Sequence, residues 1–217
     1  MIELLRIDCM EYMKTVPDKF FDLAIADPPY GINAANDNRF NTKSRGAGSA
    51  RKNYIKKNWD ISIPDDEYFN EIYRVSKEQI IWGANYFGLI GGMLFWHKNQ
   101  TSYTSSNGEI AFLSMKYGID YVNILWHGAY QQNMKSKERR IHPTQKPVEL
   151  YKWLLKNYAK EGDNIFDSHG GSMSIAIACH DMKFDLTLCE IDKDYYDAGV
   201  KRYENHKNQL TTDIFFK

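Results

Sequence analysis

The sequence predicts an α/β fold with a mostly parallel central sheet flanked by helices. Short apolar runs alternate with segments of helical periodicity along most of the chain, which is the pattern of parallel strands joined by crossover helices. Polar residues with Asp, Pro or Gly follow several of the apolar runs, where such a sheet binds its ligands. The length of 217 residues, with 43% hydrophobic and 26% charged residues, is that of one globular domain.

The first half of the chain contains several expected elements. Ile2–Ile7 predicts a strand, and Cys9–Thr15 predicts a short helix. Asp22–Ala26 predicts a strand that ends at the tetrapeptide Asp27-Pro28-Pro29-Tyr30. In Asp65–Val75 the apolar residues recur at helical spacing, which predicts a helix. Four further apolar runs are expected as strands: Gln79–Gly83, Met93–His97, Ile110–Met115 and Val122–His127.

The second half continues the alternation of strands and helices. Pro147–Tyr158 predicts a helix because proline is favoured in the first turn. Asn164–Asp167 and Asp185–Glu190 are apolar runs that predict strands. Ser172–Asp181 predicts a helix of small residues, and Asp192–Asn205 predicts a helix that begins with aspartate. The segment Thr211–Lys217 has no assigned element. Core positions are expected for Trp82, Trp96 and Trp126.

The composition excludes several classes of protein. Cys9, Cys179 and Cys189 form no C-x-x-C pair, which excludes a disulfide scaffold and indicates a reducing compartment. No apolar run reaches the length of about 18 residues that a membrane-spanning helix needs, and the first residues lack a signal peptide. The six histidines show no metal-ligand spacing, so no metal site is expected. We therefore expect a soluble, cytoplasmic protein.

The overall charge of zero conceals two basic segments. Residues 31–58 carry a net charge of +6 and residues 130–146 a net charge of +4, so the rest of the chain carries −10. Both segments lie beside the most distinctive short motifs, Asp27–Tyr30 and His142–Pro147. This distribution is typical of a surface that binds nucleic-acid phosphates. We expect residues 31–58 to be a basic insertion in a single domain, because the segment is too long for an ordinary loop.

The tetrapeptide Asp27-Pro28-Pro29-Tyr30 follows an apolar strand directly. Ligands of open α/β sheets bind outside the carboxyl ends of the strands, so these residues are expected in the functional site. The two prolines make a rigid step whose carbonyl oxygens stay free to accept hydrogen bonds. A carboxylate, a fixed carbonyl and an aromatic ring then stand close together, a set that suits the exocyclic amino group of a planar base.

Four motifs together resemble the S-adenosylmethionine-dependent DNA amino-methyltransferases, which methylate an exocyclic nitrogen of adenine or cytosine. Asp27–Tyr30 resembles their catalytic tetrapeptide, with aspartate in the place typical of N6-adenine enzymes. His142–Pro147 resembles the motif before the cofactor-binding helix. Ile165–Ser174 is similar to the glycine-rich cofactor loop, and Cys189–Asp192 to the acidic strand end. The order of the motifs resembles that of the circularly permuted beta class, and in particular small solitary enzymes of phages and prophages.

The resemblance, which covers about residues 1–208, implies a Rossmann-like methyltransferase fold. It also implies S-adenosylmethionine as cofactor, double-stranded DNA as partner, and pairing into a homodimer as in many relatives. Residues 115–141 would be a short target-recognition region. The implied catalytic residues are Asp27, Pro28, Pro29 and Tyr30. The implied cofactor-binding residues are Asp8, Asp27, Thr144, Lys146, Asp167, His169, Gly171, Ser172, Ser174 and Glu190.

Individual roles at the cofactor follow from position and from the resemblance. The glycine-rich loop lies between a strand and a helix, where backbone amides face the anionic end of a ligand. In the family that end is the methionine carboxylate. Lys146 can pair with it or only with solvent, and the motif around Lys146 favours the pairing. Glu190 ends the next strand, where an acid binds ribose hydroxyls. Asp8 can bind the cofactor's adenine amino group or cap the helix Cys9–Thr15, and both readings stay open.

The cofactor loop departs from the family pattern at several positions, including His169, which replaces phenylalanine, and Met173, which replaces glycine. The Cβ of Met173 is expected to disfavour a positive φ and a close backbone approach to the cofactor. A DNA-binding protein without catalysis therefore stays an alternative. Cytosine N4, RNA and a protein glutamine are alternative acceptors, although Asp27 and the basic segments favour adenine in a nucleic acid.

Overall fold

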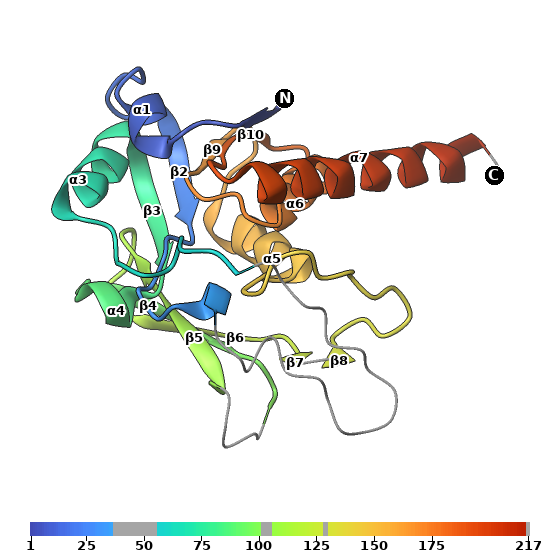
Figure 1. Ribbon diagram of the computed structural model, residues 1–217, viewed down its shortest axis with the longest axis horizontal. Helices are drawn as coiled ribbons and strands as arrows, with labels where there is room; N and C mark the ends of the chain where they lie inside the picture. Colours follow the sequence, from blue (N-terminus) through green and yellow to red (C-terminus); the bar gives the residue numbers. More distant parts are fainter. Residues whose placement is uncertain (37–55, 101–105, 128–129, 216–217) are drawn as a thin grey trace.

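The structure, a computed structural model, describes residues 1–36, 56–100, 106–127 and 130–215. A central eight-stranded sheet has the order β1-β10-β9-β2-β3-β5-β4-β6, with helices on both faces (Figure 1). The strands are β1 (Ile2–Leu5), β2 (Phe21–Ala26), β3 (Ser76–Trp82), β4 (Gly92–His97), β5 (Gly108–Leu113), β6 (Ile119–Asn123), β9 (Asn164–Asp167) and β10 (Asp185–Cys189).

The strand directions confirm the mostly parallel sheet. Among the described strands of this sheet, β5 alone is antiparallel to its neighbours, β3 and β4. The other pairs are parallel, including β2 with β3 and with β9. The carboxyl ends of the parallel strands therefore lie along one edge of the sheet, and the amino end of β5 joins them there.

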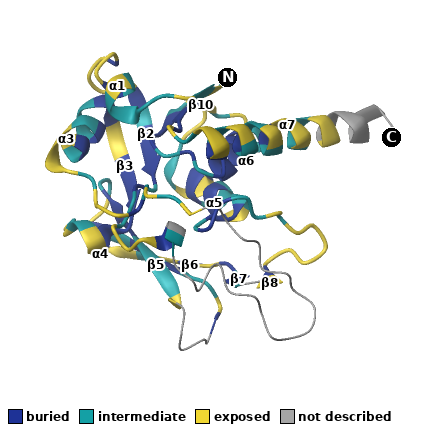
Figure 2. Ribbon diagram, in the orientation of Figure 1, coloured by how far each residue is buried: buried dark blue, intermediate teal, exposed yellow. Residues whose placement is uncertain are grey.

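Alternate residues of β2 pack on opposite faces of the sheet. Leu23 and Ile25 join the core under α5 (Val148–Tyr158), α6 (Ser174–Met182) and α7 (Lys193–Phe215). Ala24 and Ala26 join the core under α1 (Cys9–Met13), α3 (Asp66–Val75) and α4 (Ala84–Phe87). A strand covered on both faces must be apolar throughout, which explains the continuous apolar runs of the sequence. Figure 2 shows this burial along the central strands.

The expected core tryptophans and the helix starts agree with the structure. Trp82, Trp96 and Trp126 are all buried in the core. α1 begins after Asp8, whose carboxylate accepts a hydrogen bond from the Met10 amide at 2.7 Å. This cap satisfies a backbone donor that the first turn would otherwise leave free. The N-cap reading of Asp8 is thus confirmed, while its contact with a cofactor stays a prediction.

The strand expected at Val122–His127 is wrong as a single element. β6 ends at Asn123, and Trp126–His127 forms β7, which pairs with β8 (Tyr130–Gln131) in a separate two-stranded sheet. The Trp126 indole donates to the Gln145 carbonyl at 2.8 Å. This contact draws the chain out of the main sheet toward the segment before α5, a partner that local apolar pattern does not reveal.

Two helical regions also differ from expectation. α4 (Ala84–Phe87) was not predicted, because its single turn lies between glycines at each end, Gly83 and Gly88. α7 was expected to end at Asn205 but continues to Phe215, into the tail that had no assignment. Figure 1 shows its distal part extending away from the rest of the chain. Other boundaries differ by a few residues.

The basic insertion is described only at its ends. A short 3-10 turn, Ala34–Asn36, follows the tetrapeptide, and the chain is described again from Lys56. Residues 37–55, with five of the seven basic side chains of the insertion, lie outside the described residues. No helix in the described part of the chain is both long and apolar enough to cross a membrane.

Candidate active site

Asp27 lies at the carboxyl end of β2, and one of its two carboxylate oxygens is held by the protein. Oδ1 accepts a hydrogen bond from the Tyr30 hydroxyl at 2.5 Å and lies 2.5 Å from the Lys146 ammonium. The side chain is 17% exposed, and no described residue donates a hydrogen bond to Oδ2. One oxygen is therefore oriented by two partners, and the other is left for a ligand.

Lys146 reaches Asp27 from the segment before α5 and is almost completely buried, at 2% exposure of its side chain. Its ammonium contacts Asp27, Glu109 Oε2 at 3.1 Å and the Tyr30 hydroxyl at 3.1 Å, so its three N–H donors have three partners. The Trp82 ring lies 5.2 Å away. The expected pairing with the cofactor's methionine carboxylate is not what the structure shows, and that role stays a prediction.

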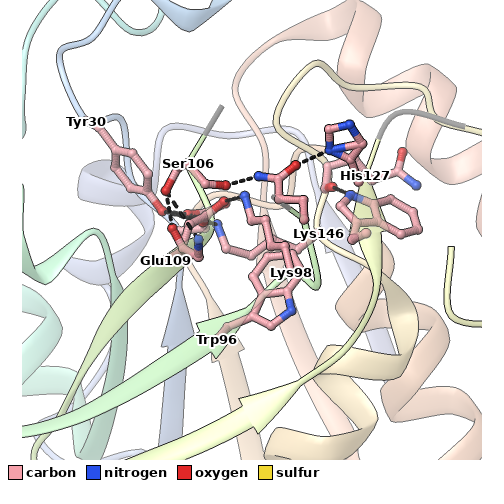
Figure 3. A network of polar contacts seen from close by, with 12 residues as sticks. Tyr30, Trp96, Lys98, Ser106, Glu109, His127 and Lys146 are labelled. Atoms are coloured by element: carbon pink, nitrogen blue, oxygen red, sulfur yellow. Dashed lines mark hydrogen bonds and ion pairs between the residues drawn. The ribbon is translucent and has the colours of Figure 1, made fainter. Parts of the chain in front are cut away.

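Glu109 and Lys98 complete the cluster, and sequence reasoning did not identify Glu109. Glu109 belongs to the amino end of β5, which reaches this edge because β5 is antiparallel. Lys98 follows β4, forms an ion pair with Glu109 and lies 4.8 Å from the Trp96 ring centre. In Figure 3, Tyr30, Lys98, Glu109 and Lys146 converge from different elements. Lys98 stands in a segment that the sequence marks as a strand end, whereas Glu109 has no local signal.

Burial and charge act differently on the two carboxylates of this cluster. Burial raises the pKa of Asp27, with Lys146 opposing the shift. Burial also disfavours the charged form of Glu109, but Lys146 and Lys98 outweigh it and lower its pKa to about 2. Glu109 is therefore ionised at neutral pH, and Asp27 is the carboxyl group closer to protonation.

Asp60 holds the backbone that follows the tetrapeptide. Its Oδ1 accepts hydrogen bonds from the amides of Tyr30 at 2.7 Å and Gly31 at 2.8 Å, and its Oδ2 accepts from the Ala34 amide at 2.8 Å. The residue is 2% exposed. Three backbone donors thus depend on one carboxylate. The sequence showed no sign of this role, because Asp60 lies in a polar stretch without a motif.

The Tyr30 ring is packed by aromatic neighbours from α4. It stacks on Tyr86 with ring centres 4.9 Å apart and an angle of 14°, and it meets Phe87 edge-on at 6.0 Å. Gly83 has a φ of +81° and lies so close to the ring that a Cβ there would collide with it. This close approach and the positive φ both require glycine. Stacking of Tyr30 on a substrate base stays a prediction.

The loop after β9 contains the expected cofactor residues Asp167 and His169. Asp167 Oδ1 accepts a hydrogen bond from the His169 amide at 2.9 Å, and burial raises its pKa to about 8. Ser168 Oγ hydrogen-bonds with the Tyr68 hydroxyl at 2.8 Å and with His169 Nδ1 at 2.9 Å. Burial lowers the pKa of His169 to about 4, so this imidazole is neutral at physiological pH.

Glu190 follows β10, beside the loop. Its Oε2 accepts the Gly171 amide at 2.7 Å and its Oε1 accepts the Asp192 amide at 2.8 Å. Because β10 pairs with β9, the Glu190 and Asp167 carboxylates belong to neighbouring strand ends. Burial raises the pKa of Glu190 as well, so both carboxyl groups would gain from hydrogen-bond donors of a ligand.

The expectation for Met173 is wrong. Its φ is 55°, in the left-handed region, and the residue is fully buried at the start of α6. The loop therefore keeps the backbone turn that glycine would adopt, although methionine occupies the position. A Cβ costs energy in this conformation, and the buried side chain offsets that cost.

The segment His142–Pro147 packs against the same loop. Thr144 Oγ1 hydrogen-bonds with His142 Nδ1 at 3.1 Å. Ser174 Oγ donates to the Lys146 carbonyl at 2.7 Å and lies 3.1 Å from Ser172 Oγ. Arg202 of α7 donates to Ser174 Oγ at 2.9 Å. The structure thus brings the expected residues Lys146, Ser172 and Ser174 together, while Thr144 contacts His142 and the Gly171 amide donates to Glu190. Contact of these residues with a cofactor stays a prediction.

Several basic residues of the two segments are paired within the protein. Lys57 contacts Asp192 at 2.6 Å and Asp194 at 2.6 Å. Lys146 belongs to the buried cluster, and the Arg140 guanidinium lies 4.5 Å from the Trp126 ring centre. The exposed basic side chains of the second segment are Lys135, Lys137 and Arg139. The net charge of a segment therefore overstates the charge that its surface offers to phosphates.

Comparison with known proteins identifies the family to which this chain belongs. A family model described as DNA methylase (N6_N4_Mtase) matches residues 81–201, which is more than half of the chain. The type II methyltransferase M.HpaI of Haemophilus parainfluenzae is 23% identical over 244 residues, and the alignment covers 93% of this chain and 74% of that protein.

Solved structures share the fold. The M1.HpyAVI–SAM complex has a TM-score of 0.59 at 18% identity, covering 93% of this chain and 100% of that one. The cytosine-N4-specific PvuII DNA methyltransferase has a TM-score of 0.61 at 11% identity, covering 95% and 90%. These likenesses confirm the expected methyltransferase fold. With a matching family model that includes Lys98, Glu109, Lys146 and the loop after β9, this chain belongs to the N6/N4 DNA methylase family.

Proposed function

We propose that this protein transfers a methyl group from S-adenosylmethionine to the exocyclic N6 of adenine in double-stranded DNA. The observation that carries the proposal is the Asp27 carboxylate, with Oδ1 held by Tyr30 and Lys146 and Oδ2 left for a substrate donor. Aspartate in this place is the form that the family resemblance associates with N6-adenine. Membership of the DNA methylase family supports the reaction class.

The residues at the ends of β9 and β10 fit this cofactor. Asp167 and Glu190 are buried carboxyl groups with raised pKa values, and a ligand with hydroxyl and ammonium donors would satisfy them. The residues that would hold it are Asp8, Thr144, Asp167, His169, Gly171, Ser172, Ser174 and Glu190, with Lys146 as a further candidate. When bound, the cofactor supplies the methyl group on a sulfonium sulfur.

The tetrapeptide would prepare the amino nitrogen of a base that has left the stack. Asp27 Oδ2 accepts one amino hydrogen and the Pro28 carbonyl accepts the other, which draws electron density onto the nitrogen and orients its lone pair. Pro29 keeps the step rigid, and Tyr30 supports the base. The gain in rate comes from orientation and from the electrostatics of a closed site.

DNA phosphates would meet the exposed basic side chains beside the site. Lys135, Lys137 and Arg139 lie in the segment between β8 and α5, within the expected target-recognition region, 115–141. Such contacts position a duplex without reading its sequence. The basic insertion would add to this surface.

One labelling experiment tests both the reaction and the base. The protein is incubated with methyl-labelled S-adenosylmethionine and unmethylated bacterial DNA, and the digested DNA is analysed by mass spectrometry. Label in N6-methyladenosine supports the proposal. Label in N4-methylcytosine would support the methyltransferase reaction but overturn adenine as the substrate base. Absence of label would overturn the proposed function and favour a DNA-binding protein without catalysis.

The variant that tests the role of Asp27 is Asp27→Asn, which keeps the size of the side chain and removes its charge. Transfer is expected to fall by at least about 100-fold, the lower range for loss of a positioned acid or base. Cofactor binding measured by calorimetry is expected to remain. Full activity of Asp27→Asn would contradict the role of Asp27.

A further inference from the structure

The charges around Asp27 are not shared evenly. Two carboxylates, Asp27 and Glu109, and two ammonium groups, Lys98 and Lys146, form one network. Lys146 lies between the carboxylates, whereas Lys98 pairs with Glu109. Asp27 therefore shares a single ammonium, and Glu109 contacts two.

Removing one charge from this network would leave another unbalanced in a site that is shielded from water. The Lys146 side chain is buried, and those of the other three residues are at most 23% exposed. Charge interactions are stronger in such a place than at the surface. The contacts also come from different elements, β2, the end of β4, β5 and the segment before α5, so the tertiary structure maintains them.

We propose that Glu109 is a positioning residue that shares the Lys146 ammonium with Asp27 and holds it between the two carboxylates, with Lys98 as its own counter-ion, so that Asp27 is the carboxylate of this cluster that changes protonation during the reaction. This inference rests on the proposed function. When the methyl carbon bonds to the amino nitrogen, its bond to the sulfonium sulfur would break with the electron pair going to sulfur, and the nitrogen would carry one proton in excess. One N–H bond would then break, its electron pair would stay on nitrogen, and the proton would pass to Asp27 Oδ2.

The direction of the pKa shifts agrees with this geometry. Burial raises the pKa of Asp27, and it also opposes ionisation of Glu109, whose pKa nevertheless falls to about 2 because of the two lysines. Lys146 is held in its charged form by both carboxylates, which raise its pKa against the effect of burial. The other titratable groups that act on Asp27 or respond to it are Tyr30, Tyr68, Tyr151 and Asp167.

Two substitutions should move the pKa of Asp27 in opposite directions. Glu109→Gln removes a negative charge near Asp27 and leaves the Lys146 ammonium to Asp27 alone, so the pKa of Asp27 should fall. Lys98→Gln removes the cation that balances Glu109, so the pKa of Asp27 should rise. A residue that only supports packing would not produce shifts of opposite sign. Each variant alone predicts the direction in which the pKa of Asp27 moves. If one variant does not fold, the other still tests the inference.

The first measurement does not depend on activity. Aspartate carboxyl carbons are labelled with ¹³C in the full-length protein without ligands, and the Asp27 resonance is assigned by its loss in Asp27→Asn. Its titration is then followed by NMR in the wild type, Glu109→Gln and Lys98→Gln. Glu161→Gln is the control, because Glu161 is exposed in the turn after α5, and it should leave the titration unchanged. An unmoved titration in the Glu109 variant, or shifts of the same sign in both variants, would overturn the inference.

The second measurement is the pH profile of methyl transfer. In Glu109→Gln the acid limb of kcat should move to lower pH together with the Asp27 titration, and kcat should fall about tenfold, which is modest for a group that acts through another. KM for DNA and for the cofactor should stay within about twofold, because the substitution should leave unchanged the interactions that bind the ground state and the transition state equally. A change in KM alone would contradict the role. Absence of transfer by the wild type would overturn the proposed function instead, and the NMR titration would still decide the electrostatic role of Glu109.

Discussion

Met173 and Gly199 pack so closely that a Cβ on Gly199 would lie 2.8 Å from Met173 Cγ and 2.9 Å from its Sδ. Met173 has a φ of 55°, a conformation that costs a residue with a Cβ about 1–2 kcal/mol. Burial of a methionine side chain contributes about 1.5–3 kcal/mol. Burial of this side chain in the core and against α7 therefore offsets the backbone strain, which explains how methionine occupies a position whose φ favours glycine.

Substitution of Met173 can separate these two effects. Met173→Ala should lower the free energy of unfolding by about 2–4 kcal/mol, because the buried side chain is lost while the strain remains. Met173→Gly loses the same contacts but removes the strain, so it should be the more stable of the two by about 1 kcal/mol. Urea unfolding measures both. Equal stabilities, or a less stable glycine variant, would contradict the balance described here.

Substitution of Asp60 should reduce catalysis without direct contact with the reacting groups. Asp60→Ala leaves the amides of Tyr30, Gly31 and Ala34 without their acceptor, and a lost buried acceptor costs about 1–3 kcal/mol of stability. The tetrapeptide would then be less well oriented, so kcat should fall by about 10- to 100-fold. Steady-state kinetics below the melting temperature checks this. Asp60→Asn, which keeps one acceptor oxygen, should lie between Ala and the wild type, and an Asn variant worse than Ala would contradict the explanation.

Asp167 should make the stability of the protein depend on pH. Burial raises the pKa of Asp167 from its ordinary value of 3.8 to about 8 in the folded state, so folding favours the protonated carboxyl group. The stability that the protonated Asp167 contributes to the folded protein is fully present below about pH 4 and is lost as the pH rises through about 8. Asp167→Asn stays neutral, so its unfolding free energy relative to the wild type should increase between about pH 5 and pH 8, by at most about 4 kcal/mol.

Urea unfolding of the two proteins without ligands, at both pH values, provides the measurement for Asp167. The comparison is made between the variant and the wild type at each pH, so other titrating groups cancel to first order. A difference in stability that is the same at both pH values would mean that the folded protein keeps Asp167 ionised.

Glu190 should contribute to cofactor affinity through its orientation. The amides of Gly171 and Asp192 hold its two oxygens, and a bound ribose would donate to the remaining lone pairs. Glu190→Gln replaces one acceptor oxygen by a donor, so the Kd for S-adenosylmethionine should rise about tenfold, which corresponds to about 1.4 kcal/mol. Calorimetry measures this change, with Glu161→Gln as the control that should leave the Kd as in the wild type. An unaltered Kd in Glu190→Gln would exclude Glu190 from the cofactor site.

The sequence by itself determined the fold class and the position of the main motifs. Buried strands are continuous apolar runs and helices have apolar residues at helical spacing, so both appear in local pattern. Asp27 after β2, Asp167 at the end of β9 and Glu190 after β10 then follow, because polar residues at strand ends meet at one edge of a parallel sheet.

The tertiary structure decided which of these residues act together. Glu109 joins Asp27 because β5 is antiparallel and brings its amino end to the active edge. Lys146 contacts Asp27 although more than a hundred residues separate them in the chain. Asp60 holds the loop after the tetrapeptide from a stretch that has no motif.

Met173 shows the same limit for the backbone. Its left-handed conformation contradicts its own preference, but its side chain is buried in the core and packs beside Gly199 on α7. Local propensities record what a residue prefers among its chain neighbours. Strand direction, ion pairs between distant segments and strained turns depend on packing between elements, and that packing becomes defined when the whole sheet and its helices assemble.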